Sequence, residues 1–155
     1  MPSSMSKNVF RKGLRAVADG RHLEALAYIE AAMQIEGHRG APLPMSYLSY
    51  FGLCLCLGSS RHREARELCE RAARAEFYNP DLHLNLGQVC ARAGDRRSAF
   101  EAYVRGLRLN PHHPGLVRAL RRLGIRRRPV IGFLSRRNPV NRVLGRLRAG
   151  AAGAA

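Results

Sequence analysis

The most reactive side chains of this sequence are four cysteines and a histidine that lies among them. Cys54, Cys56, His62 and Cys69 lie close together, and thiolate and imidazole are ligands that zinc prefers. On one continuous helix, however, residues two apart point about 200° away from each other, so Cys54 and Cys56 cannot bind the same ion. We therefore expect no metal site. We expect these thiols and Cys90 to be reduced and buried as small apolar side chains.

Other patterns that carry chemistry are missing from the sequence. It contains no P-loop, no glycine-rich dinucleotide turn and no serine nucleophile elbow. For His112-His113 we prefer a solvated linker, with weak metal binding as the alternative. Glu67 with Arg71, and Glu70 with Arg74, have the helical spacing of surface ion pairs. The sequence thus predicts a protein without enzymatic activity and without a cofactor.

The elements that must position these residues are predicted to be helices. Trp is absent, and no stretch alternates polar and apolar residues as a strand does. Glycine and proline break the chain at Gly20, 38–44, 58–60, Gly94 and 110–111. We expect helices at about 6–18, 23–35, 45–57, 61–77, 80–93, 97–109 and 114–123. Ser60 is expected to cap the fourth of these helices with its side-chain oxygen.

A spacing of small residues recurs along these helices. Gly13, Gly52 and Gly87 are 39 and 35 residues apart, and the seven-residue step from Gly13 to Gly20 returns between Gly87 and Gly94. A period of this length is the signature of a helical repeat array. Small residues allow paired helices to approach closely, and we expect such contacts at Gly13, Ala25, Ala32, Gly52, Ala65, Ala72, Gly87, Ala99 and Gly106.

The last copy of this spacing carries further residues at fixed positions. It comprises the run 85–95 (NLGQVCARAGD) and, after it, Ala99-Phe100, Tyr103, Gly106-Leu107 and Asn110-Pro111. With these residues the segment 79–111 resembles a tetratricopeptide repeat, and the segments 6–36 and 45–78 resemble two more copies. The resemblance implies an all-α fold, a short right-handed α-solenoid of helix-turn-helix repeats over residues 1–123, in which 114–123 is a capping helix.

The resemblance also implies a concave groove, lined by the first helix of each repeat, that holds a peptide. The positions carried over to this sequence are Phe10, Leu14, Val17, Ser49, Leu53, Cys56, Leu84, Gln88 and Arg92. This surface is mostly apolar and favours an amphipathic helix or an apolar strand-like segment as its ligand. Two alternatives stay open: neighbouring helices cover Phe10 and Leu53 and no ligand exists, or residues 129–134 fold back and fill the groove.

Some members of this family grip the terminal carboxylate of a chaperone with lysine, asparagine and arginine side chains. The positions that match theirs hold Phe10, Leu14, Tyr50, Asp81 and Asn85. Only one amide remains, and Asp81 would repel a carboxylate. The sequence therefore predicts that this carboxylate clamp is absent.

The charge is distributed unevenly along the chain. The formal net charge is +16 and nearly all cations are arginines, yet no acid follows Glu101. Residues 124–148 form a basic extension, and the Ala/Gly tail at 149–155 is expected to be disordered. The extension predicts contact with an acidic partner, nucleic acid or an anionic membrane surface through Arg126, Arg127, Arg128, Arg136, Arg137, Arg142, Arg146 and Arg148. We favour instead packing of its apolar residues on the capping helix, and a GC-rich genome could also produce the arginine excess.

Taken together, the sequence favours a non-enzymatic adaptor or scaffold that binds a protein or peptide through the groove. Binding of nucleic acid or an anionic membrane through the basic extension is the alternative. No apolar run approaches the ~20 residues needed to span a bilayer. Residues 1–20 predict a repeat helix and not a signal peptide, so we expect a cytoplasmic protein.

Overall fold

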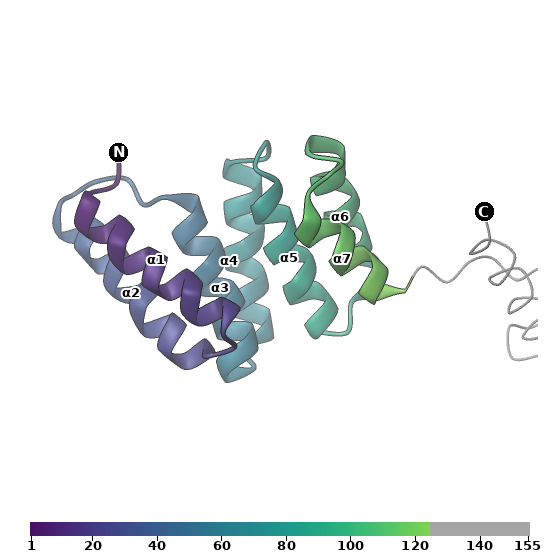
Figure 1. Cartoon of the computed structure of the whole chain (residues 1–155), viewed down its shortest axis with the longest axis horizontal. Helices are drawn as coiled ribbons and strands as arrows, with labels where there is room; N and C mark the ends of the chain where they lie inside the picture. Colours follow the sequence, from purple (N-terminus) through teal and green to yellow (C-terminus); the bar gives the residue numbers. More distant parts are fainter. Residues whose placement is uncertain (125–155) are drawn as a thin grey trace, which may run out of the picture. The chain divides into compact units, whose positions relative to one another are not determined.

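The computed structural model describes residues 1–124, and within this range the chain forms helices and no strand (Figure 1). The helices are α1 (Ser4–Ala18), α2 (His22–His38), α3 (Met45–Ser59), α4 (His62–Ala75), α5 (Pro80–Arg92), α6 (Arg96–Leu109) and α7 (Pro114–Leu123). The contacts divide the chain into the units Met1–Leu123 and Gly124–Ala155. The eight arginines predicted for the basic extension, the segment 129–134 and the tail 149–155 lie outside the described residues.

The helices pack as three pairs along the chain, followed by a last helix. α1 packs on α2, α3 on α4 and α5 on α6, each pair being joined by a short turn. Between pairs, α2 contacts α3, α4 contacts α5, and α3 also contacts α5, while α7 packs on both α6 and α5. The described residues therefore form an all-α helical repeat solenoid, as the sequence predicts. None of these helices is long and apolar enough to cross a bilayer.

The small residues predicted at the helix contacts are all buried. A Cβ atom added at Gly13 would lie 2.9 Å from Ile29 Cγ1, and one at Gly52 would lie 2.9 Å from the carbonyl oxygen of Ala65. At Gly87 such an atom would collide with the ring of Tyr103. At these three glycines the backbones of paired helices thus approach so closely that any side chain larger than hydrogen would separate them.

The turns inside the pairs also share a backbone conformation. Gly20 and Gly94 have φ values of 76° and 85°, and Ser60 takes the equivalent place in the second pair with φ 56°. Ser60 is thus the residue that ends α3 in the left-handed conformation. The prediction that Ser60 caps α4 is wrong, because Arg61 precedes that helix and forms no side-chain cap hydrogen bond.

Side-chain caps also begin α1, α5 and α6. Ser3 Oγ accepts a hydrogen bond from the Ser6 amide at 3.0 Å, and Asn79 Oδ1 accepts one from the Asp81 amide at 3.1 Å. In α6 the capping residue is Asp95. Each cap satisfies an amide that has no partner inside the helix. The fourth helix ends at Ala75, two residues earlier than expected.

A buried carboxylate fixes the end of α2 on the start of α1. Glu36 accepts hydrogen bonds from the Ser3 amide, at 2.7 Å, and from Ser6 Oγ, and it pairs with Arg39 at 3.1 Å. The hydrogen bond from Ser6, followed by that from the Ser3 amide, holds the pKa of Glu36 below its ordinary value. With these partners α2 extends to His38, three residues beyond the predicted end.

The close contact at Gly87 yields a test of the packing. Gly87→Ala places a methyl group against the buried ring of Tyr103, and we expect it to lower the free energy of unfolding by about 1–3 kcal/mol. Gly37→Ala is the matched control, because Gly37 lies in α2 with open space around it. That change should stabilise the helix by up to ~1 kcal/mol. Urea unfolding followed by circular dichroism measures both, and equal effects would contradict the packing described.

Candidate functional site

Four of the nine residues predicted to line the groove lie in the core. Phe10 is 9% exposed, Leu53 2%, Cys56 1% and Ser49 0%. The ring of Phe10 stacks on that of Tyr47 with centroids 4.1 Å apart, so an aromatic contact fills the space between α1 and α3. The prediction that these four residues face a ligand is wrong, because neighbouring helices cover them.

The amide of the carboxylate-clamp positions is also used inside the protein. Asn85 Nδ2 donates a hydrogen bond to Ser49 Oγ at 3.1 Å, and Cys69 Sγ donates one to the carbonyl oxygen of Ser49 at 3.3 Å. Both contacts are buried and join α3 to its neighbours α5 and α4. Asn85 therefore has a partner in the core and does not point to a ligand.

The remaining predicted residues reach the surface at two places. Leu14 and Val17, on α1, are half-buried against the core cluster that contains Phe10, Ile29 and Tyr47. Leu84, Gln88 and Arg92, on α5, line a hollow of about 710 Å³. The structure thus brings three of the nine predicted residues together in a cavity, at the end of the array away from α1.

The hollow lies between α5 and α7 and is amphipathic. Its apolar lining residues are Leu57, Leu84, Ala91, Tyr103, Gly115, Ala119 and Leu123, and its polar ones are Gln88, Arg92, Arg96, Arg118 and Arg122. Leu57 comes from the end of α3 and Tyr103 from α6. Sequence reasoning assigned α7 only a capping role, and it missed that α7 supplies one wall of this cavity.

A histidine outside the hollow holds α7 against α5. His113 Nδ1 accepts a hydrogen bond from the Leu116 amide at 3.2 Å, so the proton is on Nε2, which donates to Asp81 Oδ1 at 3.0 Å. His113 thereby caps α7 and ties it to the first turn of α5. The predicted solvated linker is wrong for this residue, whose side chain is only 15% exposed, whereas His112 is exposed.

Charges are segregated between the first and second helices of the pairs. We call the surface of α1, α3, α5 and α7 the first-helix face and that of α2, α4 and α6 the second-helix face. Among the described residues, the first helices contain a single carboxylate, Asp81, which His113 already contacts. Their cations are Lys7, Arg11, Lys12, Arg15, Arg92, Arg118, Arg121 and Arg122. The first-helix face is therefore strongly cationic.

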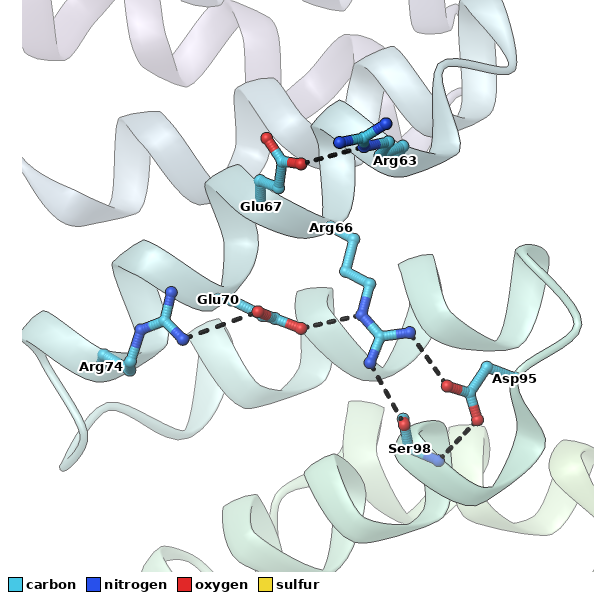
Figure 2. Close-up of polar contacts among 7 residues, drawn as sticks. All are labelled: Arg63, Arg66, Glu67, Glu70, Arg74, Asp95 and Ser98. Carbon is cyan, nitrogen blue, oxygen red and sulfur yellow. Dashed lines mark hydrogen bonds and ion pairs between the residues drawn. The ribbon is translucent and has the colours of Figure 1, made fainter.

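On the second-helix face, by contrast, several arginines are paired with carboxylates (Figure 2). Arg66 Nε contacts Glu70 Oε1 at 2.8 Å, and Arg66 Nη1 contacts Asp95 Oδ2 at 2.9 Å. The latter contact joins α4 to the start of α6 and so links two repeats. Glu70 also pairs with Arg74 at 3.6 Å, which confirms that predicted pair.

The other predicted pair on α4 is not formed. Glu67 contacts Arg63 at 3.3 Å, one turn toward the N-terminus, instead of Arg71. Arg97 and Glu101 form a similar pair on α6 at 3.2 Å. All of these side chains are largely exposed, and such pairs contribute little each. Their consequence is that most carboxylates of the second-helix face are neutralised locally.

Asp95 combines two roles at the junction of α4 and α6. Its Oδ1 accepts a hydrogen bond from the Ser98 amide at 3.0 Å, and its Oδ2 contacts Arg66. The hydrogen bonds from Ser98, and next the one from Arg66, lower the pKa of Asp95 to about 2. The Asp95 carboxylate thus remains charged at neutral pH and stabilises both the helix start and the repeat junction.

The four thiols lie in the core and are expected to be unreactive. Cys54 packs in a core cluster with Phe10 and Tyr47, while Cys56 packs in a separate one with Leu53 and Val89, as expected for residues two apart on a helix. Burial raises the pKa of Cys54 and of Cys69 to about 12. In residues 1–124, no three His, Cys, Asp or Glu side chains are placed to hold a metal ion.

The structure resembles solved tetratricopeptide-repeat domains. The Sgt2 TPR domain from Aspergillus fumigatus superposes with a TM-score of 0.63 at 23% identity, covering 79% of this chain and 78% of that one. The Arabidopsis OM64 TPR domain gives a TM-score of 0.60 at 18% identity, covering 80% and 98%. The fold is that of a tetratricopeptide-repeat array.

A third solved structure with this fold holds a ligand segment. PcrH in complex with the chaperone binding region of PopB gives a TM-score of 0.58 at 14% identity, covering 80% of this chain and 95% of that one. PcrH is a protein of Pseudomonas aeruginosa. The sequence matches no protein-family model and no curated protein. At these identities the comparisons establish the fold of the tetratricopeptide-repeat array.

The junction at Asp95 generates a prediction about stability. Asp95→Asn keeps a capping oxygen but removes the charge that Arg66 contacts, whereas Asp95→Ala removes both. We expect the urea midpoint of unfolding at neutral pH to fall for Asp95→Asn and further for Asp95→Ala. Because the folded pKa of about 2 lies below the ordinary 3.8, the wild-type advantage is complete above about pH 4 and is lost as the pH falls toward 2.

Glu67→Gln is the control for this prediction, because within the described part of the chain Glu67 pairs only with Arg63, which is 94% exposed. Its midpoint should stay near that of the unmodified protein at every pH. An unchanged midpoint for Asp95→Ala, or an advantage of the wild type that grows in acid, would contradict the role assigned to the Asp95 carboxylate.

Proposed function

We propose that this chain is a non-enzymatic interaction adaptor that binds a segment of a partner protein on its first-helix face. The observation that carries the proposal is the amphipathic hollow of about 710 Å³ between α5 and α7. Its size lies within the range of about 300–1,000 Å³ that is usual for ligand pockets. An apolar lining with polar groups at fixed places is suited to a protein segment held by side-chain burial.

The fold supports the same role. In the solved complex of PcrH, a protein of this fold is bound to the chaperone binding region of PopB. Adaptor function requires no reactive group, and the thiols of the described residues are buried and protonated at neutral pH. A solenoid binds a partner through its extended surface. On the first-helix face, α3, α5 and α7 lie side by side and form such a surface.

The proposal narrows the predicted groove to one end of the array. At the α1 end, Phe10 packs against the rings of Tyr47 and Tyr50, with centroids 4.1 Å and 5.7 Å away. At the α7 end, Ala91 and Ala119 line the cavity and leave room between the helices. A partner segment can therefore insert between α5 and α7, whereas aromatic side chains already fill the space between α1 and α3.

A site-specific photo-crosslinker tests where a partner binds. We place benzoylphenylalanine at Gln88, in the hollow, or at Glu67, on the second-helix face, in the full chain, and irradiate in an extract of the source cells. Gln88 lines the cavity and Glu67 is 67% exposed, so both positions accept the bulky residue. We expect light-dependent protein adducts at Gln88 and none at Glu67.

Adducts of equal yield at the two positions, or adducts at Glu67 alone, would show that partners do not use the first-helix face. The unlabelled chain in excess must suppress the adduct at Gln88, since a specific site is saturable. Failure of that competition would also count against the proposal.

A further inference from the structure

We infer that the hollow between α5 and α7 recognises an acidic segment of a partner protein that carries bulky apolar side chains. Its carboxylates would contact Arg92, Arg118 and Arg122, and its apolar side chains would fill the space beside Leu84, Ala91 and Ala119. The inference rests on the proposed function and adds to it the chemical class of the partner.

The first support is that three arginines of the hollow form no ion pair with an acid of the described residues. Arg92, Arg118 and Arg122 are exposed and form no ion pair within residues 1–124, in contrast to Arg63, Arg66, Arg74 and Arg97 of the second-helix face. The nearby carboxylates are engaged elsewhere: Asp81 with His113, and Asp95 with Arg66 and Ser98. A ligand must therefore bring the complementary charge.

The second support is the placement of these side chains. Arg118 and Arg122 are four residues apart on α7, and Gln88 and Arg92 are four residues apart on α5, so each pair projects from one face of its helix. All four line the same cavity. Two helices thus present guanidinium groups to one space, and a guanidinium can bind a carboxylate through two parallel hydrogen bonds.

The third support is the apolar lining, which distinguishes this partner from a plain polyanion. Leu57, Leu84, Ala91, Ala119 and Leu123 line the cavity between the arginines. Nucleic acid would gain nothing from this lining, because base stacking needs an accessible aromatic ring, and the only ring of the cavity, Tyr103, is 3% exposed. An acidic peptide with leucine or phenylalanine side chains uses both the charge and the apolar surface.

A hollow on the second-helix face does not share these properties. It measures about 310 Å³ and is lined by groups of both signs, which include Arg66, Glu70, Arg74 and Glu101. Glu70 already pairs there with Arg66 and Arg74 (Figure 2), and Glu101 pairs with Arg97. An external carboxylate is therefore expected to bind more strongly in the hollow between α5 and α7 than in this one.

Binding of defined peptides to the full chain tests the inference. The probe is a fluorescein-labelled peptide of twelve residues in which six glutamates alternate with leucine and phenylalanine, measured by fluorescence anisotropy. One variant has glutamine in place of glutamate, and another has serine in place of the apolar residues. We expect the first peptide to bind. Each variant should bind at least about tenfold more weakly, since both charge and burial contribute to the affinity.

Matched substitutions locate the site. The double change Arg118→Glu with Arg122→Glu should weaken binding of the probe about tenfold or more. The control Arg71→Glu with Arg108→Glu makes the same change of net charge at exposed arginines of α4 and α6 that form no ion pair within residues 1–124, and it should change the affinity less than about threefold. Arg136→Glu with Arg137→Glu provides the same control in the basic extension. Ala119→Leu, which fills the cavity, should also weaken binding.

The inference is overturned if the serine variant binds as tightly as the probe, if either control pair weakens binding as much as Arg118→Glu with Arg122→Glu, or if a single-stranded oligonucleotide of equal charge competes as well as unlabelled peptide. It also fails if the probe does not bind at all. Adducts from Gln88 in the crosslinking experiment would then still support the adaptor, whereas the loss of both signals would remove the adaptor as well.

Discussion

The fold depends on the close approach of paired helices at positions that lack a side chain. Gly13, Gly52 and Gly87 each face the second helix of their pair at a distance that leaves no room for a methyl group. Gly106 does the same for α7, since a Cβ there would lie 2.7 Å from Leu116 Cδ1. Because every pair closes on the same kind of contact, successive pairs stack in register and their first helices share one face.

What differs along that face is the size of the side chains between neighbouring first helices. Aromatic rings of Phe10, Tyr47 and Tyr50 fill the contact near α1, whereas Ala91 and Ala119 leave a cavity near α7. Charge follows the same division of faces. Acids of the second helices pair with their arginines and, through Arg66 and Asp95, join α4 to α6. The first helices have almost no acids, so their arginines remain available to a partner.

The spacing of glycine and alanine predicts the helices, their pairing and the buried contacts, because these depend on residues within one repeat. It does not predict which side chains stay exposed, since that depends on the gap between neighbouring pairs. Phe10 and Leu53 occupy repeat positions that suit a groove, yet neighbouring helices cover them. The sequence predicts only one wall of the hollow. Leu84, Gln88 and Arg92 follow from the repeat alignment, whereas Arg118 and Arg122 belong to a helix that the repeat pattern assigns to capping. The segregation of charge could have been found in the sequence, had the acids been counted helix by helix.

Hydrogen–deuterium exchange of the full chain, with and without the acidic peptide that contains leucine and phenylalanine, tests most directly that binding takes place between α5 and α7. A ligand that contacts both helices slows the local opening through which their amides exchange. We predict slower exchange in 80–92 and 114–123, with 62–75 and 22–38 unchanged. Protection confined to the second helices, or to residues beyond 124, would contradict binding on the first-helix face.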